Sequence, residues 1–136
     1  MPLVRIDLTA TAPERVRGIA DAVQRGIVDA LGIAKEDRFQ VITQHTPAEM
    51  ICDPTFMGIA RTADVVVIQV TMTAGRSREM KTALFRRVVD ELGACQVRPE
   101  DVFISLLEMP VENFSIGNGE SVADRLPAHL QPAEAG

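Results

Sequence analysis

Pro2, Arg76 and Arg78 are the residues of this chain whose types and positions could do chemistry together. Methionine is readily removed when the next residue is as small as proline, and its removal would leave Pro2 as a free secondary amine. An α-amino group titrates near neutral pH, so it can serve as a base or, once protonated, as an acid. A base can move a proton beside a carbonyl, and a cation or iminium can stabilise the enolate that decarboxylation leaves. The alternative is that Pro2 marks only a processed N-terminus.

Arg76 and Arg78 lie at the expected start of a helix, where unpaired backbone amides favour an anion. Their guanidinium groups could hold a substrate carboxylate through paired hydrogen bonds. Residues two apart on a helix do not share a face, so both arginines reach one site only if Arg76 lies in the preceding loop. A solvated helix face explains Arg78 equally well.

The elements that must position these residues occur twice, as strand–helix–strand units at about 3–46 and 65–108. The first unit predicts a strand over 3–8, a helix that opens on a capping box at 11–14 and closes at Gly32, and a strand over 39–43. The second predicts a strand over 65–72, a helix from about 77 to 92 closed by Gly93, and a strand over 102–107. Short segments of the two halves align in the same order, which indicates a duplication.

Two βαβ units in one sheet predict an α/β (α+β) domain with a four-stranded core sheet and two helices on one face, because such crossovers are almost always right-handed. We expect one domain over residues 1–126 and a disordered Ala/Pro-rich tail over 127–136. The bare sheet face favours a closed homo-oligomer, with the loop 47–64 packed on a neighbour. Residues 113–119 should form a turn and a short strand.

Composition excludes several classes of partner. The net charge of −5 and the absence of Trp and Tyr argue against nucleic acid. The start lacks the pattern of a secretion signal and no apolar run could span a membrane, so we expect a cytoplasmic protein. Cys52 and Cys95 lack the spacing of a metal site, and we expect both to be reduced and buried.

These features together resemble the tautomerase superfamily, through Met-Pro at the start, the βαβ repeat and the Arg-rich segment 75–78. The closer resemblance is to the malonate semialdehyde decarboxylase subfamily, from residue 2 to about 119. It rests on Asp37-Arg-Phe-Gln40, the His45-x-Pro47 turn and a Ser-x-Gly-x-Gly motif at 115–119. The resemblance implies a homotrimer, no metal or organic cofactor, Pro2 and Asp37 as catalytic residues, and Arg76 as the carboxylate-binding arginine.

The resemblance assigns Asp37 to binding or activating water beside Pro2. A structural turn role remains the alternative, because Asp101 occupies the same position in the other half, where the family assigns no catalysis. The subfamily usually has Asp-Trp-Ser-Phe-Gly where this chain has Asn113-Phe-Ser-Ile-Gly117. Phe114 and Ile116 should therefore line a wider apolar substrate pocket.

The resulting hypothesis is a cofactor-independent enzyme acting on a small carboxylate-bearing carbonyl compound. Decarboxylation of malonate semialdehyde (3-oxopropanoate) to acetaldehyde and carbon dioxide is the first expectation. Keto–enol tautomerisation of a 2-oxo acid such as phenylpyruvate, and hydration of a haloacrylate, would use the same residues. A trimeric interaction module without catalysis is the alternative from a different class.

Overall fold

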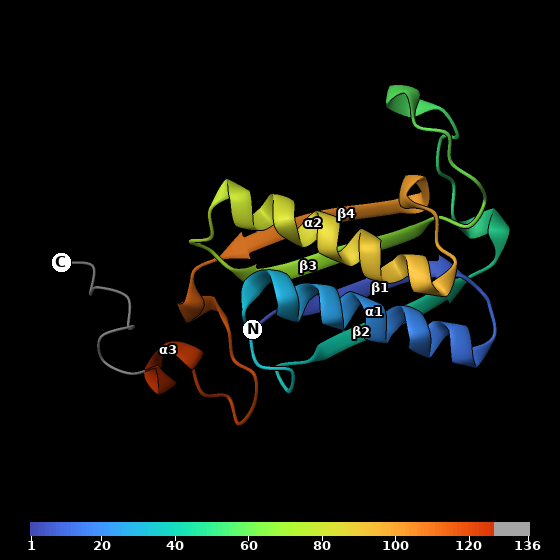
Figure 1. Cartoon of the computed structure of the whole chain (residues 1–136). Coiled ribbons are helices and arrows are strands. Elements are labelled where there is room, and N and C mark those ends of the chain that lie inside the picture. The colour runs from blue at the N-terminus through green and yellow to red at the C-terminus, as the bar shows by residue number, and fades with distance from the viewer. Residues whose placement is uncertain (127–136) are drawn as a thin grey trace.

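The computed structural model describes residues 1–126 as one sheet covered by two helices (Figure 1). The strands are β1 (Leu3–Thr9), β2 (Phe39–His45), β3 (Val66–Thr73) and β4 (Val102–Met109), and the helices are α1 (Pro13–Leu31), α2 (Arg78–Leu92) and the short α3 (Val122–Arg125). Both long helices lie on the same face of the sheet, so the predicted fold class is confirmed. The tail predicted to be disordered, 127–136, lies outside the described residues.

The sheet has the order β2-β1-β3-β4, with β1 parallel to β2, β3 parallel to β4, and β1 antiparallel to β3 at the centre. Leu3 pairs with Phe39 in the first half, and Val67 pairs with Phe103 in the second. The partners are 36 residues apart in both cases (39 − 3 and 103 − 67). This identical register supports the duplication that the sequence indicates.

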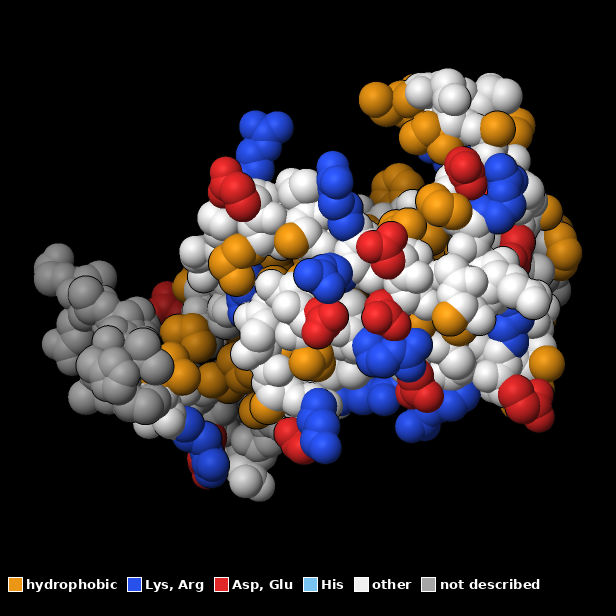
Figure 2. Space-filling model, in the orientation of Figure 1, with side chains coloured by type: hydrophobic (Ala, Val, Ile, Leu, Met, Phe, Trp, Pro, Cys, Tyr) orange, Lys and Arg blue, Asp and Glu red, His pale blue; other side chains and the backbone are white. Residues whose placement is uncertain are grey.

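The core lies between the sheet and the two helices, where alternate residues of β1 and β3 meet the apolar stripes of α1 and α2. The helices are in close contact where Gly26 of α1 meets Val88 of α2. A Cβ atom on Gly26 would lie 2.8 Å from the backbone N and Cα of Val88. Gly26 therefore sets the spacing of the helix layer. The outer side of that layer carries interspersed acidic and basic side chains (Figure 2).

The opposite face of the sheet has no covering layer within residues 1–126, and it exposes large apolar side chains. These are Phe39, Val41, Phe103 and Leu107. Between β2 and β3 the chain forms an arm that projects beyond the sheet and contains two short turns, Pro47–Glu49 and Phe56–Gly58 (Figure 1). On this arm Ile51 and Met57 are 91% and 81% exposed. The predicted loop is confirmed, and its packing on a neighbour stays a prediction.

Several local predictions were wrong. The capping box at 11–14 does not form, because the N-cap of α1 is Ala12, one residue after Thr11, and Ala12 makes no side-chain cap. α2 ends at Leu92 with Gly93 as its C-cap, as predicted, but Gly93 keeps right-handed helical angles. The left-handed position falls on Gln96 (φ 61°) after one further turn, whereas Gly32 ends α1 with φ 67°. No strand forms over 113–119: residues 114–116 are irregular, and a turn follows at 118–119. Cys52 is exposed on the projecting arm rather than buried.

Candidate active site

One end of the sheet brings together the segments that carry the candidate residues. Because β2 is parallel to β1, the start of β2 lies beside the start of β1. Because β3 is antiparallel to β1 and parallel to β4, the ends of β3 and β4 reach the same edge. Pro2, Asp37, the loop after β3 and the segment after Met109 therefore lie at one edge of the sheet.

The first amine of the chain forms an ion pair with Asp37 at this edge. The Met1 nitrogen lies 3.0 Å from Asp37 Oδ2, and the two side chains are only 16% and 22% exposed. Pro2 itself is buried and begins the run into β1. While Met1 is attached, the Pro2 nitrogen is an amide nitrogen with no basicity. Removal of Met1 would make Pro2 the terminal amine. This amine would lie one residue along the chain from the Met1 nitrogen that now pairs with Asp37.

A cavity of about 370 Å³ opens beside Pro2. Its wall is mainly apolar. Phe114 and Ile116, the two residues that the sequence predicts to line the substrate pocket, contribute to it. The other lining residues are Met1, Leu3, Phe39, Thr71, Met109, Asn113 and Ser115. Met1 fills one side of this cavity, so its loss would enlarge the space next to Pro2. A cavity of this kind suits a small ligand held by a few polar groups.

Arg76 lies in the loop before α2, as its proposed role requires. Gly75 has φ 118°, which turns the chain after β3, and Ser77 caps α2 by accepting a hydrogen bond from the Met80 N–H at 3.2 Å. Arg76 Nη1 donates to the carbonyl and hydroxyl oxygens of Thr73 at 2.9 and 3.1 Å. Both bonds use Nη1, and within residues 1–126 no hydrogen bond occupies Nε or Nη2, which leaves them available for a carboxylate.

Arg78 lies apart from the cavity. It is exposed on the first turn of α2 and lines a shallow depression with Glu79, Thr82, Ala83 and Arg86. The residues that line the cavity beside Pro2 include neither Arg76 nor Arg78. The chain fold therefore brings Phe114 and Ile116 to Pro2 directly, places Asp37 and Arg76 at the same edge, and leaves Arg78 on the helix surface.

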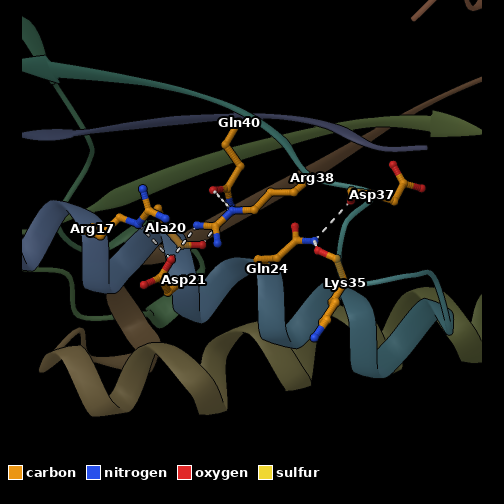
Figure 3. A network of polar contacts seen from close by, with 8 residues as sticks. All are labelled: Arg17, Ala20, Asp21, Gln24, Lys35, Asp37, Arg38 and Gln40. Carbon is orange, nitrogen blue, oxygen red and sulfur yellow. Dashed lines mark hydrogen bonds and ion pairs between the residues drawn. The ribbon is translucent and has the colours of Figure 1, made fainter.

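The turn that carries Asp37 is fastened to α1 by side chains (Figure 3). Gln24 Nε2 donates to the carbonyl oxygens of Lys35 and Asp37 at 3.3 and 3.2 Å. Arg38 Nη2 donates to Asp21 Oδ1 at 2.6 Å, and this hydrogen bond holds the pKa of the Asp21 carboxyl below its usual range. The Asp37 carboxylate points away from the helix (Figure 3). The turn therefore presents that carboxylate to the edge where the chain begins.

Asp101, the repeat mate of Asp37, has different partners. It is 1% exposed and accepts hydrogen bonds from the N–H and hydroxyl of Thr62 at 2.7 and 2.6 Å. Neither aspartate caps its own turn, because each binds a group far along the chain. The two positions differ in backbone and in partners: Asp101 ends the short helical turn Pro99–Asp101 and fixes the chain entering β3, whereas Asp37 follows a turn and faces the chain terminus.

Sequence reasoning missed Gln24 and Thr73, which hold the segments that carry Asp37 and Arg76. Gln24 had a visible signal, since it is a polar residue inside the apolar stripe of α1, next to Val23 and one turn before Ile27. Thr73 had none, because a threonine at a strand end is ordinary. Among residues 1–126 no helix is long and apolar enough to cross a membrane, and no group of three or more His, Cys, Asp or Glu side chains is placed to hold a metal ion.

Comparison with known proteins gives consistent matches along most of the chain. Two family models described as tautomerase enzyme match residues 37–117 and 2–58. A probable tautomerase of Bacillus subtilis (strain 168), YusQ, is 33% identical over 126 residues, which cover 89% of this chain and 97% of that protein. A second probable tautomerase of that strain, YrdN, is 29% identical over 123 residues, with 89% and 95% covered.

Solved structures give the same picture. The crystal structure of FG41 malonate semialdehyde decarboxylase inhibited by 3-bromopropiolate is 38% identical, with a TM-score of 0.86 over 91% of this chain and 97% of that chain. A malonate semialdehyde decarboxylase studied for its decarboxylase and hydratase activities is 29% identical, with a TM-score of 0.85 over 92% and 99%. A symmetric trimer of fused 4-OT, 20% identical with a TM-score of 0.73 over 88% and 94%, shares the fold.

Proposed function

Because this chain belongs to the tautomerase enzyme family, we propose that it is a decarboxylase of a small 3-oxo acid such as malonate semialdehyde, with Pro2 as its catalytic amine after removal of Met1. The observation that carries the proposal is the 3.0 Å pair between the chain's first nitrogen and Asp37 beside an apolar cavity. Amine, carboxylate and cavity are the parts that such a reaction needs.

The proposed reaction begins with Arg76. Its Nε and Nη2 bind the substrate carboxylate, while Thr73 holds Nη1. This places the substrate carbonyl toward Pro2 in the cavity. The substrate is then held at both ends, by its carboxylate and by its carbonyl group. This fixed orientation lowers the entropic part of the activation barrier for the reaction.

Loss of carbon dioxide is the step that the amine assists. The bond between the carboxylate carbon and the α-carbon breaks, and its electron pair moves into the carbonyl group, whose developing oxyanion the protonated Pro2 stabilises. The α-carbon then takes a proton, which gives acetaldehyde and carbon dioxide from malonate semialdehyde. Asp37 balances the charge of the amine and orients water or the leaving carboxylate.

The cavity supports a small substrate with an apolar body. Phe114 and Ile116 stand in its wall, and the volume of about 370 Å³ increases once Met1 has gone. The same space admits a 2-oxo acid with a larger side chain. Keto–enol tautomerisation of such an acid is therefore the second candidate, and the relatives named as probable tautomerases favour it.

We also propose that the protein assembles as a homotrimer through its uncovered sheet face. That face exposes Phe39, Val41, Phe103 and Leu107, which are between 42% and 56% accessible in the single chain. Exposed apolar area of this extent favours association. The symmetric trimer of fused 4-OT has this fold and offers a geometry for the assembly.

The test starts with purified protein whose intact mass shows that Met1 is absent. Malonate semialdehyde and phenylpyruvate are supplied separately, and acetaldehyde formation and enol absorbance are followed. Pro2→Ala and Asp37→Asn should each lower kcat at least about tenfold. Arg76→Ala should raise KM, and Arg86→Ala, which removes an exposed arginine of α2, is the matched control.

Three results would count against this function. Equal rates for the parent and Pro2→Ala would exclude catalysis by the amine. Turnover of phenylpyruvate alone would favour the tautomerase. Absence of turnover with both substrates in a Met-processed trimer would favour the interaction module. Arg78→Ala, measured beside Arg76→Ala, decides whether the second arginine contributes to carboxylate binding.

A further inference from the structure

Gln24 is a buried polar side chain whose position the core does not require. Its side chain is 5% exposed on the apolar stripe of α1, between the helix and the start of β2. Burying an amide among apolar groups costs free energy unless its hydrogen bonds are replaced. An apolar side chain of the same length would fill this place without that cost.

The hydrogen bonds of Gln24 are directed entirely to the turn that carries Asp37. The Nε2 group donates to the carbonyl oxygens of Lys35 and Asp37, on the two sides of Glu36 (Figure 3). Two carbonyl acceptors fix the amide with its nitrogen toward the turn, because an amide oxygen cannot donate. The Oε1 atom is then buried and has no hydrogen-bond partner among the described residues.

An unpaired buried oxygen costs about 1–3 kcal/mol, which offsets the free energy that the two hydrogen bonds of Gln24 contribute to folding. The main effect of the arrangement is therefore to fix the position of the turn. The next residues of the turn are fastened separately, through Arg38 to Asp21 and through Gln40 to the carbonyl of Ala20 at 2.8 Å. Gln24 contacts the backbone of Asp37 itself. It therefore sets the position from which the Asp37 carboxylate reaches the chain's first nitrogen, 3.0 Å away.

We propose that Gln24 is a positioning residue for catalysis: it holds the Asp37 peptide so that the carboxylate stays beside the amine of the processed chain. This inference rests on the proposed function. Gln24 touches no reacting atom, and it acts through Asp37 alone. Its loss should therefore reduce kcat without weakening the binding of the substrate carboxylate, which is assigned to Arg76.

The test compares Gln24→Met with Arg15→Met in the Met-processed full chain. Methionine keeps the length of glutamine and favours a helix, so the core stays filled. Arg15 lies on the same helix and donates to the Cys95 carbonyl at 3.2 Å and to the Asp64 carboxylate at 2.8 Å, far from Asp37. Both variants lose part-buried hydrogen bonds, but only one of them loses contact with the turn.

In Gln24→Met we expect kcat to fall at least about tenfold, since a displacement of about 1 Å at a reacting group costs about a hundredfold. KM should stay within about twofold. Arg15→Met should lose stability and keep its kcat. Amide hydrogen exchange over residues 34–40 should become faster in Gln24→Met and stay unchanged in Arg15→Met.

A kcat close to the parent value in a folded Gln24→Met would overturn the inference, as would an equal loss of kcat in Arg15→Met. If Gln24→Met does not fold, Gln24→Asn decides in its place, because the shorter amide stays polar but cannot reach both carbonyls. Failure of the parent with every substrate would count against the proposed function alone. The exchange measurement would still show whether Gln24 holds the turn.

Discussion

Replacing Gly26 by alanine should separate the two long helices and destabilise the protein. A Cβ atom at this position would lie 2.8 Å from the backbone N and Cα of Val88 and 2.9 Å from its Cγ2. Carbon atoms in ordinary contact are about 3.5–4.0 Å apart, so the backbones of α1 and α2 must move apart by several tenths of an ångström or more. Neither backbone can rotate away as a flexible side chain would.

Two opposing effects decide the size of the change. Alanine is favoured over glycine in a helix by about 1 kcal/mol. Overpacking a close contact costs about 1–3 kcal/mol, and a backbone contact falls at the upper end of that range. We therefore expect Gly26→Ala to lower the free energy of unfolding by about 2 kcal/mol.

Gly18→Ala is the matched control, because Gly18 lies on the same helix and its added Cβ would meet only Cys95 Sγ at 3.4 Å. This variant should gain up to about 1 kcal/mol from helix propensity. Both variants are unfolded in urea at one protein concentration, since an oligomer's stability depends on concentration. If Gly26→Ala proves as stable as Gly18→Ala, the close approach of the helices described above is wrong.

Three further predictions follow. Asp21→Asn should reduce the free energy of unfolding by about 0.5 kcal/mol at pH 7, since its partner Arg38 is only partly buried. Because that pair lowers the pKa of Asp21, its contribution to stability is present above the unfolded-state pKa of about 3.9 and disappears as the pH falls through the folded-state pKa. Urea titrations of the parent and Asp21→Asn at neutral and acid pH would contradict this if the two proteins differed in unfolding free energy by the same amount at both pH values. Phe103→Lys should place charge on the uncovered sheet face and yield monomers in sedimentation, and an unchanged trimer would remove that face from the interface. Ile116→Phe should narrow the cavity and lower kcat/KM for phenylpyruvate about tenfold relative to malonate semialdehyde, whereas equal effects on both would place the substrate elsewhere.

Periodicity was sufficient to predict the helices and strands and the layers that they form. The two amphipathic helices, the strands and the repeat could be predicted because each half repeats one pattern, and the register of 36 residues in each half agrees with it. Helix and strand ends were less accurate. Ala12 begins α1 although it offers no side-chain cap, and Gln96 adopts the left-handed angles expected of Gly93. Packing of the chain around these ends outweighs the local preference of a single residue.

The candidate site could be predicted only in part. The sequence predicted a helix from about residue 77 and left open whether Arg76 lies in the loop before it. The structure has Arg76 in that loop, with Gly75 in the turning position and Ser77 in the capping position. The proximity of Asp37 to the chain's first nitrogen depends on strand order, which spacing alone does not give. The partners of Asp101 were unforeseen for the same reason, because Thr62 is 39 residues away in the chain.

The antiparallel pairing of β1 with β3 gives the domain an internal twofold axis, so its two ends have the same architecture. A polypeptide, however, has a single amino terminus. At one end β1 begins two residues after Met1, whose nitrogen faces Asp37. At the other end the corresponding strand, β3, continues from the preceding loop, and Thr62 donates two hydrogen bonds to the Asp101 carboxylate. The repeated scaffold therefore has a terminal nitrogen at one end only, and the proposed chemistry is confined to that end.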